Sequence, residues 1–251
     1  MRRSVCGIGK ISNIEIQDLY ITIAGEVRDF DARERCPSKP LMLADRYSQF
    51  AGAAAIEAMK SAGYDGPVAN GYRAASIIGS GVGGLATLEK GYEDLFIHKK
   101  KATHPLTLLR TIASSACAHV SIEYGIKGPC FGTVSACSTA AHAIGLTYQM
   151  VKAGMVDIGV CGASEAAVTY GAMRSWQAMR VLSPDGLWPF AKKRNGTVLA
   201  EGAGILVLED FEHAKARGAK PLAEIVGFGM TSDAAEDRKS TRLNSSHRTG
   251  S

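Results

Sequence analysis

Residues 132–145 read GTVSACSTAAHAIG, and this stretch decides the fold class. It places one cysteine, Cys137, between a β-prone run at 130–134 and a helix of small residues predicted over 138–153. The first turn of a helix exposes unpaired N–H groups, and the helix dipole favours negative charge there. A thiol in that position is stabilised as the thiolate, which is the nucleophilic form. The sequence therefore predicts that Cys137 is a catalytic nucleophile.

The alternative is that Cys137 is a buried structural cysteine, which is a frequent role for free thiols. The helix that follows carries Ala140, Ala141, Ala143 and Gly145, where a solvent-facing helix would carry charges. Small residues allow this helix to pack closely against its neighbours. The strand–turn–helix context favours the nucleophile over the structural cysteine.

The composition is that of an ordinary globular protein, with 46% hydrophobic and 21% charged residues. No apolar run approaches the roughly 18 residues of a membrane span, and no signal-peptide pattern follows Arg2 and Arg3. The six cysteines show neither CxxC pairs nor metal-ligand spacing. They are predicted to be reduced thiols of a cytoplasmic protein that holds no metal.

The net charge of +5 comes mostly from residues 237–251. These contain four basic residues and one acidic residue, so the rest of the chain carries only +2. A nucleic-acid partner is therefore not expected. The run DRKSTRLNSSH at 237–247 fits the translation of a short sequencing adapter in one continuous frame. Residues 237–251 are predicted to be a non-native, disordered tail, and a natural basic tail is the alternative.

The expected elements alternate between strands and helices, which predicts a layered α/β sheet covered by helices. Helices are predicted over 45–62, 85–96, 106–124 and 210–217. Strands are predicted over 75–79, 156–162, 204–209 and 223–228, with a further β-prone stretch at 14–23.

Residues 79–84, GSGVGG, match GxGxxG between a strand and a helix, so a dinucleotide site is one alternative. The acid that would bind ribose should close the next strand, whereas Asp94 lies inside the helix that follows. The glycines are therefore predicted to form a tight turn near a site. No cofactor is expected.

None of the six histidines is placed as an evident base for Cys137. His142 lies about a turn and a half further along the same helix, which directs it away from the thiol. Packing or a local hydrogen bond is expected for it. The remaining histidines fall in loops, in other helices or in the tail: His98, His104, His119, His213 and His247. Glu201, at the head of a predicted strand, is expected to have a structural role.

Six segments, in this order, resemble one family: DRYSQFAGAAAIEAMKSAG, GSGVGG, GPCFGTVSACSTAAHAIG, GASEA, EGAGILVLED and GFGMTSDA. Over residues 40–236 the chain is similar to β-ketoacyl-[acyl-carrier-protein] synthases of the elongating type. The resemblance implies a thiolase-like fold, in which two βαβαβαββ halves form α/β/α/β/α layers, usually as a homodimer. It also implies that Cys137 accepts an acyl chain from acyl carrier protein as a thioester, with its own N–H as one oxyanion donor.

The chain departs from the family pattern in ways that indicate an N-terminal half. The family carries two histidines and a lysine for decarboxylation in HGTGT-like and KSxxGH-like segments, and neither segment occurs here. The opening strand is also missing, and Ala191 and Asn195 stand where aspartates are usual. We therefore expect one domain over 1–236, truncated at both ends, that does not condense on its own. A polyketide-type ketosynthase and a non-catalytic partner subunit remain alternatives, although Cys137 argues against the chain-length factors, which lack it.

Overall fold

The computed structural model describes residues 5–36, 38–232 and 234, and it divides the chain into two compact units. One unit joins residues 5–29 with 167–201 and with residues 232 and 234. The other unit joins residues 30–166 with 202–231 and contains the larger sheet. The predicted tail at 237–251 lies outside the described residues, so that expectation stays a prediction.

A four-stranded sheet forms the centre of the second unit, in the order β4-β3-β5-β6. The strands are β3 (Ala74–Gly79), β4 (Cys130–Phe131), β5 (Ile158–Glu165) and β6 (Gly202–Glu209). β3 pairs in parallel with β4 and β5, and the register joins Gly79 to Ala163. β6 runs antiparallel to β5. β3 is buried throughout and β5 along most of its length, as expected of parallel strands that are covered on both faces.

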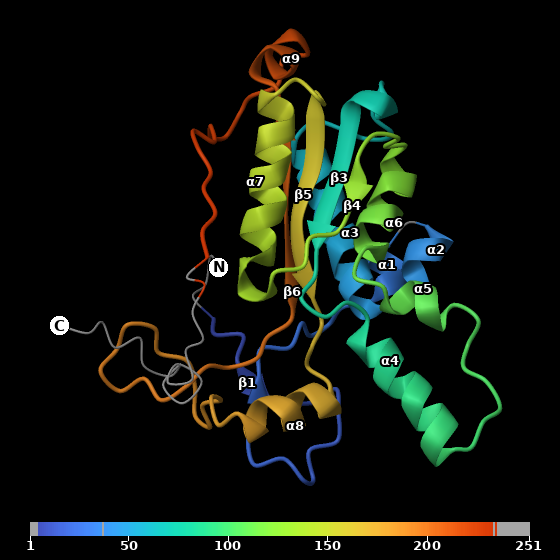
Figure 1. The fold of residues 1–251 in the computed structure, drawn as a ribbon, viewed down its shortest axis with the longest axis vertical. Helices are drawn as coiled ribbons and strands as arrows, with labels where there is room; N and C mark the ends of the chain where they lie inside the picture. Colours follow the sequence, from blue (N-terminus) through green and yellow to red (C-terminus); the bar gives the residue numbers. More distant parts are fainter. Residues whose placement is uncertain (1–4, 37, 233, 235–251) are drawn as a thin grey trace. The chain divides into compact units, whose positions relative to one another are not determined.

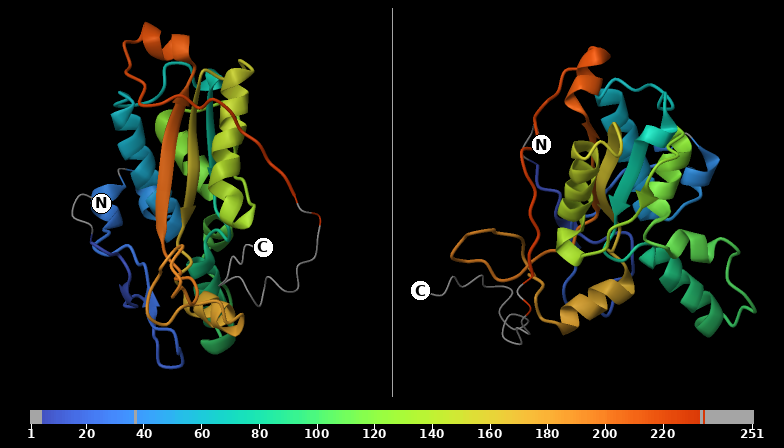
Figure 2. Two further views of the ribbon diagram at one scale, coloured as in Figure 1. Left: turned by 90° about the vertical axis from the view of Figure 1, so that its left-hand side faces the viewer. Right: turned by 45° about the horizontal axis from the view of Figure 1, so that its top comes forward.

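Helices cover both faces of this sheet (Figures 1 and 2). α7 (Thr139–Lys152) packs on one face, while α3 (Arg46–Ser61) and α6 (Ser115–Tyr124) pack on the other. Shorter elements surround them: α1 (Ala32–Arg35), α2 (Lys39–Met42), a 3₁₀ turn (Gly71–Arg73), α4 (Leu85–Tyr92), a π-helical turn (Glu93–Ile97), α5 (Thr107–Thr111), a second 3₁₀ turn (Ala136–Ser138) and α9 (Phe211–Ala216). The predicted α/β layering is confirmed in this unit.

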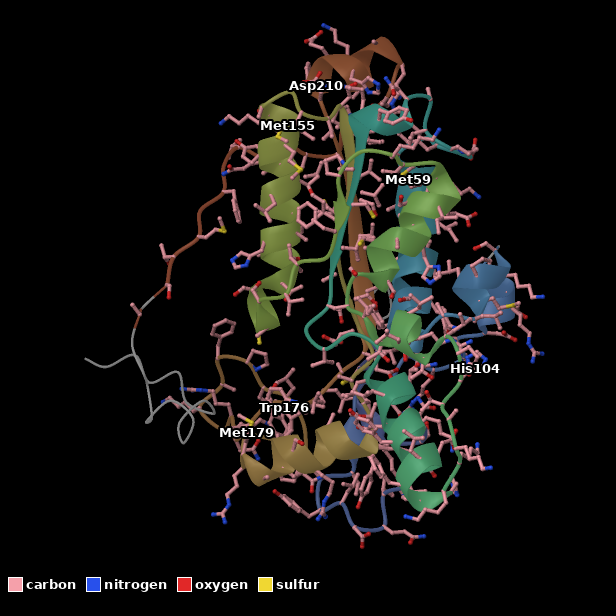
Figure 3. All side chains as sticks on the ribbon, turned by 45° about the vertical axis from the view of Figure 1, so that its right-hand side comes forward. Met59, His104, Met155, Trp176, Met179 and Asp210 are labelled. Atoms are coloured by element: carbon pink, nitrogen blue, oxygen red, sulfur yellow. The ribbon has the colours of Figure 1, made fainter. Side chains whose placement is uncertain are left out.

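The sequence explains why α3 forms where it does. The Asp45 carboxylate caps the helix by accepting from the Tyr47 N–H at 3.2 Å, and Gly63 follows its end with a φ of +83°. Core residues recur every four positions along one face, which is the spacing of an amphipathic helix. They are Tyr47, Ala51, Ala55 and Met59, the last of which is labelled in Figure 3.

Four expected elements differ in the structure. The helix predicted over 106–124 is interrupted between α5 and α6, and the helix predicted over 85–96 becomes a π-helical turn after Tyr92. The stretch 223–228 forms no strand. Of the β-prone stretch at 14–23 only the last residue is in a strand, because β2 comprises Ile23–Ala24.

The first unit is small and has its own core. It contains a two-stranded antiparallel ladder of β1 (Gly9–Lys10) with β2, and the helix α8 (Tyr170–Ala178). Buried apolar residues of the segments 5–29 and 167–201 meet in one cluster: Ile11, Leu19, Ile21, Ala24, Val168, Met173 and Leu182. Glu201 accepts from the Val27 N–H at 3.2 Å and donates its own N–H to Gly25, so it ties two segments of this unit together.

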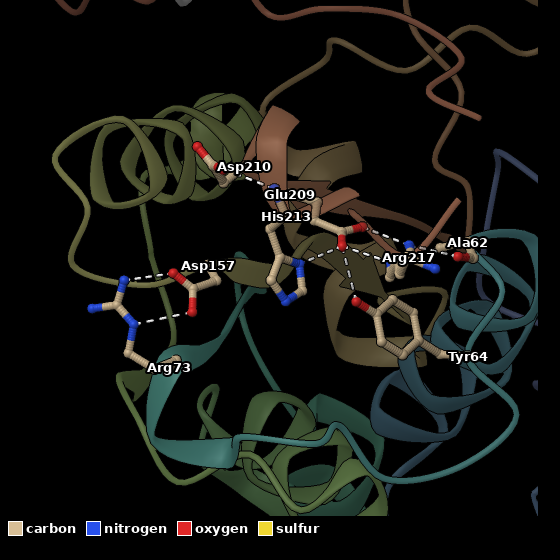
Figure 4. Close-up of polar contacts among 8 residues, drawn as sticks. All are labelled: Ala62, Tyr64, Arg73, Asp157, Glu209, Asp210, His213 and Arg217. Atoms are coloured by element: carbon tan, nitrogen blue, oxygen red, sulfur yellow. Dashed lines mark hydrogen bonds and ion pairs between the residues drawn. The ribbon is translucent and has the colours of Figure 1, made fainter. Parts of the chain in front are cut away.

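A polar cluster fastens α9 to the end of the sheet (Figure 4). The Glu209 carboxylate accepts two hydrogen bonds from Arg217, at 2.7 and 2.6 Å, and one from Tyr64 at 3.1 Å. Its Oε1 also lies 2.6 Å from Nδ1 of His213. The Arg217 guanidinium reaches the Ala62 carbonyl at the end of α3. One carboxylate therefore connects β6, α9 and the end of α3.

Candidate active site

The structure places Cys137 on the solvent side of the turn that leads into α7. Residues 132–138, which we call the Cys137 turn, connect β4 to that helix, and the cysteine lies within the 3₁₀ turn directly before it. Its side chain is exposed, so the expectation of a structural, buried thiol does not fit this geometry. The strand–turn–helix arrangement predicted from the sequence is confirmed.

Side-chain hydrogen bonds hold the Cys137 turn against the start of α7. The Thr133 hydroxyl donates to the Thr139 carbonyl at 3.1 Å, and the Ser135 N–H donates to the Thr139 hydroxyl at 2.9 Å. Oγ of Ser135 lies 2.6 Å from Nδ1 of His142. Ala136, between these anchors, has a φ of +47°, which an alanine rarely adopts. The backbone of the turn that carries the cysteine is therefore strained at Ala136, and the surrounding hydrogen bonds hold it in that conformation.

The glycine-rich turn at 79–84 is filled by a side chain of the same unit. The Glu165 carboxylate, at the end of β5, accepts from the Gly81 N–H at 2.7 Å and from the Ser80 hydroxyl at 3.0 Å. The Ser80 hydroxyl in turn accepts from the Gly83 N–H at 2.9 Å. Burial raises the pKa of Glu165, and the hydrogen bonds that it accepts oppose that effect. These donors would otherwise be free for a phosphate.

The acid that a dinucleotide site would need for binding ribose is not available either. Asp94 lies in the π-helical turn after α4, where its carboxylate forms ion pairs with Lys100 at 2.9 Å and Lys90 at 3.6 Å. It is thus bound to neighbouring lysines of its own segment. The glycine turn has a packing explanation instead, because a Cβ at Gly79 would overlap Thr133 of the Cys137 turn and Thr139 at the start of α7.

In the described part of the chain, no imidazole forms a hydrogen bond with the Cys137 thiol. His142 makes the local hydrogen bond that was expected for it, with Ser135. His98 and His213 each lie beside a glutamate, and Nδ1 of His104 accepts from the Leu106 N–H in a loop (Figure 3). Burial lowers the pKa of His119.

A second exposed thiol lies on the strand before the Cys137 turn. Cys130 of β4 interacts with the Cys117 thiol of α6 and with Ser121, and the Cys117 thiol also donates to the Ser114 carbonyl at 2.9 Å. The hydrogen bond from Cys117 lowers the pKa of Cys130 to about 7, against the opposing effect of burial. Cys36, Cys117 and Cys161 are buried. All six cysteines are free, and the described residues contain no cluster of His, Cys, Asp and Glu that could hold a metal.

Two residues of the site were missed by sequence reasoning. Ser135 is an ordinary turn serine by sequence, and nothing marks it as a partner of His142. Glu165 could have been found, because it ends a strand that runs parallel to the strand before the glycine turn. Carboxyl ends of neighbouring parallel strands lie at one edge of the sheet.

The comparisons with known proteins agree on one family. Residues 11–214 match the family described as beta-ketoacyl synthase, N-terminal domain. Nodulation protein E of Rhizobium leguminosarum bv. trifolii is 39% identical over 93% of this chain and 58% of its own length. The 3-oxoacyl-[acyl-carrier-protein] synthase 2 of Staphylococcus aureus is 38% identical over 92% of this chain and 59% of its own length. The chain thus spans somewhat more than half the length of these relatives.

Solved structures match over the same part. A beta-ketoacyl synthase from Burkholderia phymatum has a TM-score of 0.82 at 27% identity, covering 92% of this chain and 58% of its own. A type II PKS ketosynthase in complex with its acyl-carrier protein, AntDE:AntF, has a TM-score of 0.71 at 28% identity, over 86% of this chain and 54% of its own. The fold is therefore that of a thiolase-like N-terminal domain. No helix in the described residues is both long and apolar enough to cross a bilayer.

Proposed function

Because the chain belongs to the beta-ketoacyl synthase family, we propose that Cys137 takes up the acyl group in a 3-oxoacyl-[acyl-carrier-protein] synthase of fatty-acid synthesis. One observation carries this proposal, namely that the exposed thiol lies immediately before the N-terminal end of α7. Unpaired N–H groups at that end stabilise a thiolate and any oxyanion that forms beside it.

The acyl transfer requires few groups. The Cys137 thiolate attacks the carbonyl carbon of an acyl thioester on the carrier protein, and a tetrahedral oxyanion forms. The attack makes the bond between Cys137 Sγ and the acyl carbon, and collapse of the oxyanion then breaks the bond from that carbon to the carrier sulfur. The carrier leaves as a thiolate and takes up the proton that Cys137 has lost. The backbone N–H of Cys137 is the proposed donor to the oxyanion.

The second half of the reaction needs groups that these 251 residues do not contain. Decarboxylation of malonyl carrier protein, and attack of the resulting carbanion on the thioester, are assigned to two histidines and a lysine of the family. The segments that carry them do not occur in this sequence. We therefore propose that this chain alone is acylated but does not condense, and that the complete synthase acts as a homodimer.

A polyketide-type ketosynthase is the second candidate. It is favoured by the similarity to the type II PKS ketosynthase at a TM-score of 0.71. The two candidates differ in their carrier protein and in the acyl chains that they accept. Acylation by a carrier from a polyketide cluster, with none by the fatty-acid carrier, would favour this second candidate.

Acylation of the chain by hexanoyl carrier protein tests the proposal directly. We expect one hexanoyl group on the peptide that contains Cys137, detected by mass spectrometry, and its complete loss in Cys137→Ala. Cys130→Ala is the matched control, since it removes the other exposed thiol of the same stretch and should still be acylated. Acylation of Cys137→Ala to the same extent would refute the nucleophile. Appearance of 3-oxoacyl product after addition of malonyl carrier protein would refute the claim that the chain does not condense.

A further inference from the structure

The backbone of the Cys137 turn is held in a conformation that it would not adopt by itself. Ala136 has a φ of +47°, in the left-handed region, which is disfavoured for a residue with a Cβ. No glycine is present at this position to relieve the strain. Contacts around Ala136 therefore have to stabilise the turn that presents Cys137.

Ser135 provides these contacts from the residue directly before Ala136. Its N–H donates to the Thr139 hydroxyl, and its carbonyl accepts from the Ser138 N–H at 3.0 Å. Thr139 is the first residue of α7, and Ser138 is the residue directly before it. The Ser135 hydroxyl lies 2.6 Å from Nδ1 of His142, which is on the first turn of the same helix. Two of the three polar groups of Ser135 are thus bound to α7, and the third is bound to the residue at its N-terminal end.

The imidazole is itself oriented by packing. The ring of His142 meets the ring of Phe228 edge to face, with centroids 6.3 Å apart and an angle of 84° between the planes. Nδ1 is the ring atom that faces the Ser135 hydroxyl. The imidazole makes no hydrogen bond with the Cys137 thiol, so the described contacts do not make it a base for the thiol.

We propose that Ser135 and His142 are positioning residues, whose mutual hydrogen bond holds the strained Cys137 turn so that the thiol stays at the N-terminal end of α7. This inference rests on the proposed function, because it concerns the reactivity of the same thiol. Without the bond, the turn relaxes and the thiolate loses part of its stabilisation by the helix. A single hydrogen bond corresponds to about a two- to tenfold change in rate.

Alkylation of the 251-residue chain with iodoacetamide, followed peptide by peptide, tests this. Ser135→Ala and His142→Phe should each slow the alkylation of Cys137 by about two- to tenfold, and the double variant should be no slower than either single one. His142→Asn should alkylate near the wild-type rate, because its side chain keeps a polar atom close to the position of Nδ1. Ser138→Ala is the matched control, because the Ser138 hydroxyl makes no capping bond to α7.

The two histidine variants separate a hydrogen bond from packing. His142→Phe keeps an aromatic ring against Phe228 and loses the polar atoms, whereas His142→Asn does the opposite. The proposal would be overturned if Cys137 alkylated slowly in His142→Asn and at the wild-type rate in His142→Phe. It would also be overturned if the effects of the two single substitutions added up in the double variant. Modification of Ser135 by a fluorophosphonate would overturn it too, because Ser135 would then be a nucleophile.

The buried thiol of Cys161 reports on folding in the same experiment. It is expected to stay unalkylated in every folded variant. If Cys161 becomes alkylated in Ser135→Ala, that variant is not correctly folded. The test of the proposal then rests on the comparison of His142→Phe with His142→Asn. A different result would show that the proposed function itself is wrong. Wild-type Cys137 would then alkylate no faster than the exposed Cys6.

Discussion

Cys130 and Cys137 are both exposed and lie only seven residues apart, yet their surroundings differ. Cys130 has a neighbouring thiol, Cys117, whose hydrogen bond lowers the pKa of Cys130 to about 7. Cys137 owes its proposed reactivity to its place before α7. Cys130 and Cys137 can therefore react with the same alkylating reagent for different physical reasons.

The difference gives a prediction for Cys130. Because its pKa lies near 7, its alkylation rate should rise through pH 7, below the range of an ordinary thiol. Cys117→Ala removes the hydrogen bond that stabilises the Cys130 thiolate, so the rise should move to higher pH. Rates measured by mass spectrometry from pH 5.5 to 9.5 check this. Cys161→Ala is the control, and an unchanged profile in Cys117→Ala would contradict the prediction.

The proposed nucleophile could be identified from the sequence, whereas the side-chain contacts around it could not. Cys137 lies between a β-prone run and a helix of small residues, and such local patterns are visible in one dimension. Ser135 and Glu165 act through side-chain geometry that appears only after the chain has folded. Glu165 is separated from Gly81 by 84 positions. No local pattern links them.

At the scale of elements, the Glu209 cluster holds α9 in place. Burial raises the pKa of Glu209, but the hydrogen bonds from Arg217 and His213 outweigh this, so its pKa is lowered. Burial and the negative charge of Glu209 raise the pKa of Tyr64 to about 12. The Arg217 guanidinium lies 4.3 Å from the centre of the Tyr64 ring. The carboxylate form of Glu209 is therefore the one that the fold stabilises.

Arg217→Ala should lower the free energy of unfolding by about 1–2 kcal/mol, allowing for solvent screening of a partly exposed pair. Because the pKa of Glu209 is lowered by folding, its contribution is present above its pKa in the unfolded chain. It is lost as the pH falls through the folded value. Urea denaturation at pH 7 and pH 3 checks this, and the difference in stability between the wild type and Arg217→Ala should be smaller at pH 3 than at pH 7.

Lys215→Ala is the matched control for that substitution. It removes a basic residue from the same helix, and Lys215 forms only an exposed pair with Glu212 at 3.9 Å. It should change stability by less than about 0.5 kcal/mol. Equal losses in the two variants would show that the Glu209 cluster has no special role.

The elements that the sequence predicts correctly are those with local start and end signals. α3 has its Asp45 cap and Gly63, whereas no glycine or proline marks the break after α5. There the Thr111 carbonyl accepts from the Gly84 N–H, and the Ile112 carbonyl accepts from the Tyr47 hydroxyl at 2.5 Å. Tertiary partners thus take two carbonyls that a continuous helix would use.

The stretch 223–228 fails as a strand for the same kind of reason. It has β propensity, but a strand also needs a neighbour in a sheet. The Val226 carbonyl instead accepts from the Tyr148 hydroxyl on α7 at 3.3 Å. Propensity could not show which partner this segment would meet.

At the scale of the whole molecule, large apolar side chains are exposed around α5. Leu108 is 71% exposed and Leu109 is 60% exposed, and Phe96 and Ile97 of the π-helical turn are exposed as well. Exposed apolar groups of this size promote association. The chain is therefore expected to be poorly soluble by itself.

Replacing both leucines of α5 by glutamine should lower the binding of the dye ANS and raise the concentration at which the chain precipitates. The midpoint of thermal unfolding should stay within a few degrees, because these side chains are not part of the buried core. Val226→Gln, which changes another exposed apolar residue, is the control. Unchanged dye binding in the double variant would show that other surfaces cause association.

The contact between Gly79 and the Cys137 turn has a consequence for how such sequences can change. The space beside Gly79 is taken up by Thr133 and Thr139, so even a methyl group at position 79 has no room. A substitution there requires the turn to shift, because the backbone carbonyl of Thr133 would lie 2.6 Å from the added Cβ. The glycine turn at 79–84 and the Cys137 turn at 132–138 lie about fifty positions apart in the sequence. In descendants of this chain the two are therefore expected to change together or not at all.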